Sequence, residues 1–383
     1  MLCTYANYSE DKLMNIQLRK PFFPPFSIAK IEREITRAIK SGRLALGKNV
    51  ESFESKFAKY LGVKYACAVS SGTAGLHLSL LSLDIKSGQE VIVPAKTFIS
   101  TANAAMYCNA KPIFCDVDDY TFQIDPAKLK KLITKKTRAI IPVHLAGNVC
   151  DMKEIEEIAR AHNIDIIEDA AHAHGSTYDG KKAGSFGILG IFSFYPDKIM
   201  ASSDGGMVVT NDHGLYEKIL LLRNVGRKNL GKYNFSIIGY NYRMNEIQAI
   251  LANEQLRLLP MMIKRRREIA SAYDLELKKL ESLRIQKIPT NVKSSYYAYI
   301  LRLVKGDLDK FRKKLFESGI ETSPIFESLY KTKPYEDLFG KRTGLCPISE
   351  KLDGQTFTIP LHPGMTNAQV NYVIKNIKRL LCN

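Results

Sequence analysis

Short runs of β-branched and apolar residues alternate with helical patterns through the first 210 residues, and this alternation limits the possible fold more than any other feature. Isoleucines at helical spacing over 28–39 predict the first helix, with Ser27 as its N-cap and Gly42 at its end. Strands that are buried on both faces and separated by helices form a mainly parallel sheet. Seven strands are predicted, at residues 65–70, 91–94, 112–117, 138–143, 164–168, 191–194 and 207–210.

A change of pattern after residue 255 predicts a second, smaller lobe, since 383 residues exceed one ordinary core. A helical pattern runs from Asn245 to Leu259, stops at Pro260 and resumes over 263–280, which predicts a hinge. Strands at 295–303 and 356–360 and helices at 306–318 and 366–381 then predict an α+β lobe. The predicted division is an N-terminal arm at 1–25, a large domain at 26–255 and a small domain at 256–383.

The composition excludes several classes of protein. No apolar run approaches the roughly 20 residues that span a bilayer, and the chain starts with polar and acidic residues, so a soluble, cytoplasmic protein without a membrane partner is expected. The seven cysteines are an odd number without a C-x-x-C pair. They predict reduced, buried thiols rather than disulfides or a metal site.

The net charge of +17 is unevenly distributed, because residues 256–383 contain 24 basic and 13 acidic residues. An anionic partner would fit this excess. The basic runs at 128–138 and 264–268 lie on helix-like segments without interleaved aromatic residues. They therefore predict solvated helix faces and disfavour a nucleic-acid partner.

The segment from Ser70 to Gly75 joins a predicted strand to a predicted helix. Backbone N–H groups at a helix N-terminus bind anions, so the segment is a candidate phosphate site, with an ordinary tight turn as the alternative. The sequence contains neither G-x-G-x-x-G nor G-x-x-x-x-G-K-[ST]. Their absence disfavours a dinucleotide-binding protein and an ATPase.

Two further segments place reactive side chains after buried strands. Asp169 is a candidate partner of a ring nitrogen, a general base, a magnesium ligand or a structural ion-pair residue. Lys198 follows the strand at 191–194, where burial lowers the pKa of an amine, as Schiff-base chemistry requires. Together with Ser193 and the segment at 70–75, these residues match the needs of pyridoxal phosphate: an anion site, a carboxylate for the ring nitrogen and an amine for the aldehyde.

Seven motifs in this order resemble the DegT/DnrJ/EryC1/StrS family of sugar aminotransferases, which are fold-type-I enzymes that use pyridoxal 5′-phosphate. The resemblance covers residues 20–380 and implies a mainly parallel seven-stranded sheet flanked by helices, a smaller C-terminal domain and a homodimer with shared active sites. The motifs are SSGTAGLHL at 70–78, PAKTFISTANAA at 94–105, IIEDAAHAHG at 166–175, SFYPDK at 193–198, DGGMVVTND at 204–212, GYNYRMNEIQAIL at 239–251 and IPLHPGMT at 359–366.

The resemblance also implies roles for single residues. Lys198 would bind the cofactor's aldehyde and shuttle a proton, and Asp169 would keep the pyridine nitrogen protonated. Phe98 would stack on the ring, and His172 replaces a glutamine that contacts the cofactor's phenolic oxygen in many members. His144, Arg243 and Tyr330 remain undecided. The phosphate would be held by Gly72, Thr73, Ala74 and Ser193, with Asn241 from the neighbouring subunit.

The sequence departs from the family pattern at 203–206, where Ser-Asp-Gly-Gly replaces Gly-Glu-Gly-Gly, and at 325–329. The resemblance implies transfer of an amino group from L-glutamate or glutamine to a nucleotide-linked keto-deoxysugar, as in polysaccharide biosynthesis. Because IIEDAAHAHG is also similar to the cyclitol and aminohydroxybenzoate branch, an aminotransferase of that kind is the alternative. A cofactor-binding regulator without turnover is a second alternative. The family's dehydratases carry histidine at the position of Lys198, which disfavours them.

Overall fold

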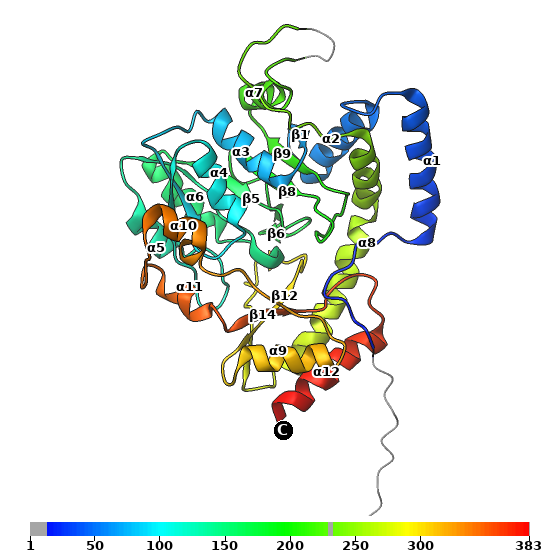
Figure 1. The fold of residues 1–383 in the computed structure, drawn as a ribbon, viewed down its shortest axis with the longest axis vertical. Coiled ribbons are helices and arrows are strands. Elements are labelled where there is room, and N and C mark those ends of the chain that lie inside the picture. Colours follow the sequence, from blue (N-terminus) through cyan, green and yellow to red (C-terminus); the bar gives the residue numbers. More distant parts are fainter. Residues whose placement is uncertain (1–13, 229–232, 383) are drawn as a thin grey trace, which may run out of the picture.

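A sheet of seven strands lies at the centre of the structure, a computed structural model that describes residues 14–228 and 233–382 (Figure 1). The strand order is β1-β9-β8-β5-β4-β2-β3; β9 is antiparallel to both neighbours, and the other four pairings are parallel. The predicted mainly parallel sheet of seven strands is thus confirmed. The strands are β1 (Tyr65–Val69), β2 (Glu90–Pro94), β3 (Lys111–Cys115), β4 (Thr137–Ile140), β5 (Asp165–Asp169), β8 (Leu189–Ser193) and β9 (Gly206–Thr210).

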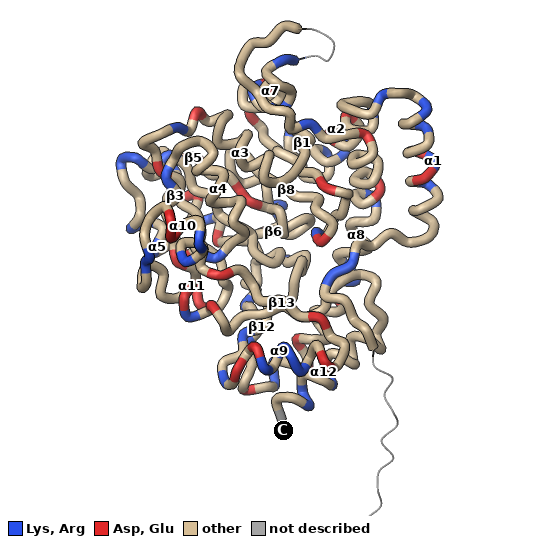
Figure 2. The backbone as a smooth tube through the Cα atoms, viewed as in Figure 1, with Lys and Arg blue, Asp and Glu red and all other residues tan. Residues whose placement is uncertain are grey.

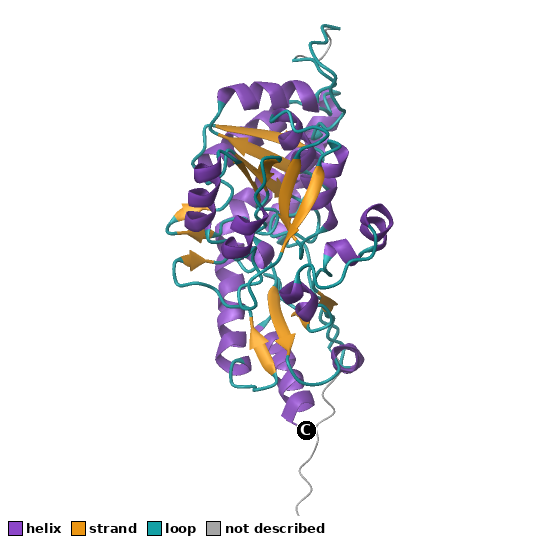
Figure 3. Cartoon of the chain, turned by 90° about the vertical axis from the view of Figure 1, so that its left-hand side faces the viewer, coloured by secondary structure: helices purple, strands orange, loops and turns teal. Residues whose placement is uncertain are grey.

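Both faces of this sheet are buried under helices (Figure 3). In β1, Ala66 and Ala68 pack into one hydrophobic cluster, whereas Cys67 and Val69 pack into a second cluster on the opposite face. Strands β1, β8 and β9 contain no charged residue (Figure 2). The helices that pack into the first cluster include α2 (Lys48–Leu61), α5 (Pro126–Leu132), α6 (Met152–His162) and α8 (Glu246–Leu277). Those that pack into the second include α3 (Gly72–Ser82), α4 (Ile99–Tyr107) and α7 (His213–Arg223).

A second sheet, antiparallel and of four strands, lies beside the first in the order β10-β12-β14-β13 (Figure 1). Its hydrophobic cluster includes Tyr273 of α8, Phe311 of α9 and Val373 of α12. The two strands and two helices predicted for this lobe are confirmed within a few residues. The elements are β10 (Leu283–Ile285), β12 (Tyr299–Leu303), β13 (Ser323–Pro324), β14 (Thr356–Ile359), α9 (Leu308–Glu317) and α12 (Asn367–Cys382).

Helix α8 runs without a break through Pro260, so the predicted stop and hinge at this residue are wrong. A proline inside a helix removes one hydrogen bond and costs about 3 kcal/mol. Leu259 before it and Met262 and Ile263 after it are all buried in the first hydrophobic cluster. Burial of three such side chains stabilises the helix by more than the proline costs, at about 1.5–3 kcal/mol each.

Helix α1 (Pro25–Ser41) begins before Ser27, so the prediction of Ser27 as its N-cap is wrong. The N-cap is Pro24, and Gly42 ends the helix in the left-handed conformation at φ +67°, as predicted. Ser27 lies buried in the first turn, where its Oγ donates a hydrogen bond of 2.8 Å to Glu254 Oε1 on α8. The hydroxyl thus makes a tertiary contact that the local pattern does not reveal.

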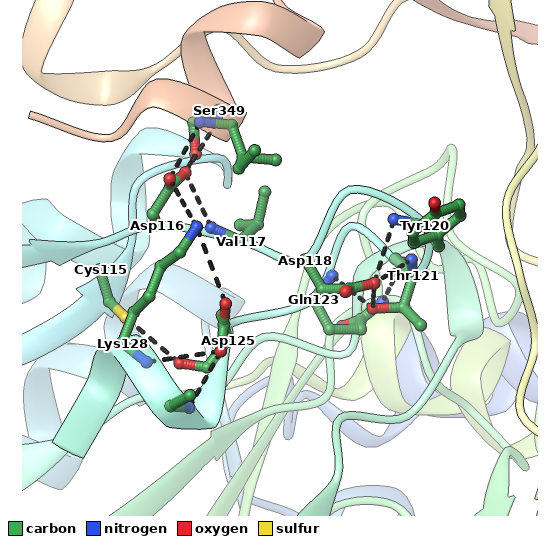
Figure 4. A network of polar contacts seen from close by, with 12 residues as sticks. Cys115, Asp116, Val117, Asp118, Tyr120, Thr121, Gln123, Asp125, Lys128 and Ser349 are labelled. Carbon is green, nitrogen blue, oxygen red and sulfur yellow. Dashed lines mark hydrogen bonds and ion pairs between the residues drawn. The ribbon is translucent and has the colours of Figure 1, made fainter. Parts of the chain in front are cut away.

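Several short elements were not predicted; β11, β6 and β7 form a third sheet, and the elements over residues 329–352 pack against the large sheet. Tyr330, Tyr335 and Cys346 pack into the second hydrophobic cluster. Asp116, after β3, accepts a hydrogen bond of 2.7 Å from the backbone N–H of Ser349 (Figure 4). The elements are β6 (Thr177–Tyr178), β7 (Lys181–Lys182), β11 (Val292–Lys293), α10 (Lys333–Phe339), α11 (Pro347–Leu352) and the 3₁₀ helices η1 (Leu145–Gly147) and η2 (Leu329–Lys331).

Five cysteines in the described residues are buried and free, which agrees with the predicted buried thiols; Cys3 and the side chain of Cys382 lie outside what the structure describes. The five are Cys67, Cys108, Cys115, Cys150 and Cys346. Within residues 14–228 and 233–382, no helix is both long and apolar enough to cross a membrane.

Candidate active site

A cavity of about 520 Å³ opens where strands of the large sheet end. Ligands of parallel α/β sheets bind at the carboxyl ends of the strands. Of the nine residues predicted from the sequence, seven line this cavity, and Ala74 and Asn241 do not. The seven are Gly72, Thr73, Phe98, Asp169, His172, Ser193 and Lys198.

The segment between β1 and α3 forms one wall of the cavity. A Cβ on Gly72 would lie 2.9 Å from the Cβ of Ser193, so only glycine lets the backbone come this close to the end of β8. Thr73 Oγ1 lies 2.7 Å from Ser100 Oγ, at the start of α4. The N-termini of α3 and α4 therefore meet beside three hydroxyl groups, which is a suitable environment for an anion such as phosphate.

Asp169 is the last residue of β5 and is buried at the back of the cavity. Its Oδ2 accepts a hydrogen bond of 2.8 Å from Thr101 Oγ1, and its Oδ1 accepts one of 3.2 Å from the backbone N–H of Ala171. Burial raises the pKa of Asp169, although these two donors and the charge of Lys198 oppose the rise. Among the described residues, no cation lies within 4.0 Å of this carboxylate. It is a buried acid with room for a cationic partner.

Lys198 lies in the loop after β8, and its Nζ is 3.0 Å from His172 Nε2. Burial lowers the pKa of Lys198, while Asp197 acts in the opposite direction. The ring of His172 stacks on Tyr297 at a centroid distance of 4.0 Å. Burial and the charge of Lys198 hold the pKa of His172 well below its usual value. The imidazole is therefore neutral at physiological pH, as the interpretation of His172 as a hydrogen-bonding residue requires.

Three cavity residues that sequence reasoning missed surround Lys198. Asp197 Oδ2 accepts hydrogen bonds from Arg19 Nη1 at 2.9 Å and from the Tyr297 hydroxyl at 2.8 Å. Asp197 adjoins Lys198 in the sequence, and this adjacency is a signal that could have revealed it. Arg19 and Tyr297 gave no signal, because they are 178 and 100 residues away from Asp197.

The outer wall, defined by Phe98 and Phe326, closes the other side of the cavity. The two rings lie 5.9 Å apart, and Phe98 is 54% exposed. Beside Phe98, the buried Lys96 forms an ion pair of 2.9 Å with Asp353, which also accepts a hydrogen bond from the backbone N–H of Ser328. One carboxylate therefore connects the segments that carry the two rings.

His144 does not line the cavity and pairs with the equally buried Glu168 at 2.8 Å. The N–H of Cys150 donates to His144 Nδ1, so the imidazole donates from Nε2. Glu168 also accepts hydrogen bonds from the backbone N–H groups of Gly184, Phe186 and Gly187. The backbone N–H of His144 also donates to the carbonyl of Asp169 at 3.1 Å, so this pair fixes the chain around the end of β5.

Other predicted residues lie away from the cavity. The backbone N–H of Ala74 donates to Ser71 Oγ in the first turn of α3. Asn241 is exposed, and Arg243 donates to Asn224 Oδ1 at 3.0 Å. Tyr330 donates to Glu350 and is buried against the large sheet. It does not line the cavity in this chain.

Comparison with known proteins agrees with this geometry. Residues 27–378 match the model of the DegT/DnrJ/EryC1/StrS aminotransferase family. The chain is 40% identical over 342 residues to the GDP-perosamine synthase of Caulobacter vibrioides, with 88% of this chain and 91% of that protein covered. It is 36% identical to a dTDP-3-amino-3,6-dideoxy-alpha-D-galactopyranose transaminase of Aneurinibacillus thermoaerophilus, with 91% and 95% covered. The crystal structure of 3-amino-5-hydroxybenzoic acid synthase matches with a TM-score of 0.88, 29% identity and coverage of 95% and 100%.

Proposed function

The chain belongs to the DegT/DnrJ/EryC1/StrS aminotransferase family and is an enzyme of the transaminase type, and we propose that it aminates the keto carbon of a nucleotide-linked keto-deoxysugar. The proposed amino donor is L-glutamate or glutamine. The observation that carries the proposal is that Lys198, Asp169 and the anion-binding wall at Thr73 share one cavity. Two relatives named for GDP-linked and dTDP-linked amino sugars support the choice of acceptor.

The residues of the cavity fit pyridoxal 5′-phosphate as the cofactor. When bound, this group supplies an aldehyde for the amino group and a ring that withdraws electrons from the substrate carbon. The hydroxyls of Thr73 and Ser193 and the N–H groups of the α3 N-terminus would hold its phosphate. Asp169 is buried and has no cation within 4.0 Å among the described residues, so its carboxylate would pair with a protonated ring nitrogen. Phe98 would cover the ring.

Residues of the chain itself would move the proton, orient the amine and bind the substrate. Lys198 Nζ is the base that moves a proton to and from the substrate carbon, since burial favours its uncharged form. His172, neutral and 3.0 Å from this amine, orients it and donates or accepts one hydrogen bond. The outer wall at Phe98 and Phe326 supplies apolar surface to the sugar and its nucleotide, and excludes water from the amine.

The basic excess of residues 256–383 would aid encounter with a nucleotide diphosphate. Figure 2 shows basic positions on α8, α9 and α12, on the side of the second sheet. Such attraction is screened beyond about 10 Å at 0.1 M salt, so it acts on the approach of the substrate rather than on chemistry.

We also propose a homodimer in which Asn241 completes the phosphate site of the partner subunit. Its exposure and its absence from the cavity of its own chain support this role. The proposed domains are the arm at 1–25, the large domain at 26–255 and the small domain at 256–383. The four-stranded sheet and its own hydrophobic cluster support the division, although β11 pairs with β6 of the large domain and α10 and α11 return to the large sheet.

The test is an assay of purified holoenzyme with L-glutamate or glutamine and a panel of keto-sugar nucleotides and keto-cyclitols. Turnover of a keto-sugar nucleotide supports the proposal; preference for a keto-cyclitol over every nucleotide sugar overturns the choice of acceptor. Binding of the cofactor without turnover of any acceptor would favour a regulator. Borohydride reduction followed by peptide mapping should place the cofactor on Lys198, and label on another lysine would refute the assignment.

Mixing tests the homodimer. Lys198→Ala and Asn241→Ala subunits are each expected to be impaired. A heterodimer of the two has one site that carries both lesions and one that carries neither, so activity should reappear after subunit exchange. Proven exchange without recovery would refute a role for Asn241 in the partner's site.

A further inference from the structure

Asp197 has two carboxylate oxygens in different environments. Oδ2 accepts the hydrogen bonds from Arg19 and from the Tyr297 hydroxyl, at 2.9 and 2.8 Å. Oδ1 is buried and has no hydrogen-bond donor in the described residues. It lies 3.5 Å from Lys198 Nζ, within the distance of an ion pair. A buried oxygen without a hydrogen-bond donor costs about 1–3 kcal/mol of stability. The orientation of Oδ1 toward Lys198 therefore indicates an interaction with the amine.

The donors that fix Asp197 are themselves held by segments that flank the strands of the second sheet. Leu18, next to Arg19, donates its N–H to Glu321 Oε2 at 2.9 Å, and its carbonyl accepts from Leu361 at 3.2 Å. The guanidinium of Arg19 lies 4.5 Å from the centre of the Tyr297 ring, and Tyr297 is buried. The chain beside Arg19 is therefore held by two hydrogen bonds of Leu18. The carboxylate of Asp197 cannot turn away from Lys198 without losing its own two hydrogen bonds.

We propose that Asp197 is a positioning residue: fastened by Arg19 and Tyr297, its carboxylate holds the Lys198 amine toward the cavity and sets the pH at which this amine loses its proton. The inference rests on the proposed function, in which Lys198 provides the reacting amine. It adds a residue that acts through Lys198 and places part of the control of the reaction in the N-terminal segment and the second sheet.

The sign of the effect follows from all the charges around Lys198. Burial and Arg19 favour the uncharged amine, whereas Asp197 and Asp169 favour the charged one. Asp204 also lines the cavity. Neutral His172 contacts the amine, and the buried His174 interacts with the charges of both Lys198 and Arg266. Of the acids, only Asp197 has an oxygen within 4.0 Å of Nζ among the described residues. Neutralising Asp197 removes the charge that favours the protonated amine, and it also leaves the positive charge of Arg19 without its partner. Both changes lower the pKa of Lys198.

The experiment measures the protonation of Lys198 without reference to catalysis. The full chain, freed of cofactor, is labelled with trace acetic anhydride across a series of pH values, and acetylation of the Lys198 peptide is quantified by mass spectrometry. Asp197→Asn and Asp197→Ser should each lower the midpoint of Lys198 labelling by about 1–3 pH units. Asp197→Glu, which keeps the charge, should bring the midpoint back toward that of the native protein.

The matched control is Asp84→Asn, which removes the acid of an exposed ion pair of 2.7 Å with Lys218. It should leave the midpoint of Lys198 unchanged. Two results would contradict the inference. In the first, a folded Asp197→Asn or Asp197→Ser protein keeps the native midpoint of Lys198 labelling. In the second, Asp197→Glu lowers that midpoint as far as Asp197→Asn does. The two proposals fail distinguishably. Borohydride label on another lysine refutes the assignment of Lys198 in the proposed function, whatever the midpoint does. Label on Lys198 with an unmoved midpoint refutes only the role of Asp197.

Discussion

The inner site, defined by Asp169, His172 and Lys198, and the outer wall, defined by Phe98 and Phe326, border the same cavity but are built differently. The inner residues lie at the ends of strands of the large sheet or in the loops that follow, and short contacts with α4 and with one another position them. The outer wall is more open and depends on an ion pair between residues 257 positions apart. The comparison indicates that the reacting groups are encoded locally, in strand ends, while the outer wall and the residues that position Lys198 depend on contacts between distant segments.

The strongest test of the inner site is Asp169→Asn. The amide removes a charge that the proposed mechanism needs, so kcat/KM should fall by about 100- to 1,000-fold, as on loss of one preorganised electrostatic group. The folded state should keep its stability, because the substitution removes a buried charge and leaves an oxygen for the hydrogen bond from Thr101. Steady-state kinetics and thermal unfolding measure the two effects.

The matched control is Asp165→Asn, at the opposite end of β5. This variant should keep its activity, because residue 165 is four positions away from the end of the strand that borders the cavity. If Asp169→Asn were nearly as active as the native enzyme, the reaction would not depend on this carboxylate. The proposed difference between the inner site and the outer wall would then be wrong.

The same contrast explains what the sequence could predict. Lys198 and Asp169 were found because each follows a buried strand, and parallel strands end at a common edge. Tyr297 and Lys96 were not found, because one lies in a strand-like run and the other inside a loop, and their partners are far away in the chain. Pro260 was misread for a related reason, since the packing that keeps α8 continuous comes from tertiary contacts.

The outer wall is tested by Lys96→Met, which leaves Asp353 without its buried partner. Removing one member of a buried ion pair costs about 3–5 kcal/mol, and the remaining contacts of Asp353 with Ser328 and Lys331 favour the lower end. Urea unfolding should show the loss. Lys351→Met is the control, because Lys351 is half-exposed in its pair of 3.0 Å with Asp119 and should cost less than about 1 kcal/mol. Equal losses in both variants would contradict a special role for Lys96.

His174 links the inner site to acid stability. It lies between Phe192 and Phe194, and burial lowers its pKa to about 3. Below the unfolded pKa of about 6.5, only the unfolded chain binds the proton, so the folded state loses stability as the pH falls from 6.5 toward 3. The loss from this group is about 2 kcal/mol at pH 5.

His174→Leu should therefore reduce by about 2 kcal/mol the difference in unfolding free energy between pH 7.5 and pH 5. Urea unfolding at the two pH values measures it, and the exposed His162→Leu provides the matched control. An unchanged pH dependence in His174→Leu would show that this imidazole is protonated in the folded protein.

The smallest effect is expected at the outer wall itself, from Phe326→Leu. The ring of Phe326 lies 5.9 Å from that of Phe98 and 6.0 Å from that of His172, so it borders the space left for the substrate. Leucine keeps most of the apolar surface but loses the aromatic contacts, which contribute about 0.5–1.5 kcal/mol. The KM for the best nucleotide sugar should therefore rise about two- to tenfold while kcat stays nearly constant, because binding is lost equally from the ground and transition states. Phe316→Leu, on the exposed face of α9, should change neither constant. A fall in kcat with an unchanged KM would instead place Phe326 among the groups that align the reacting amine, and would erase the division between inner site and outer wall.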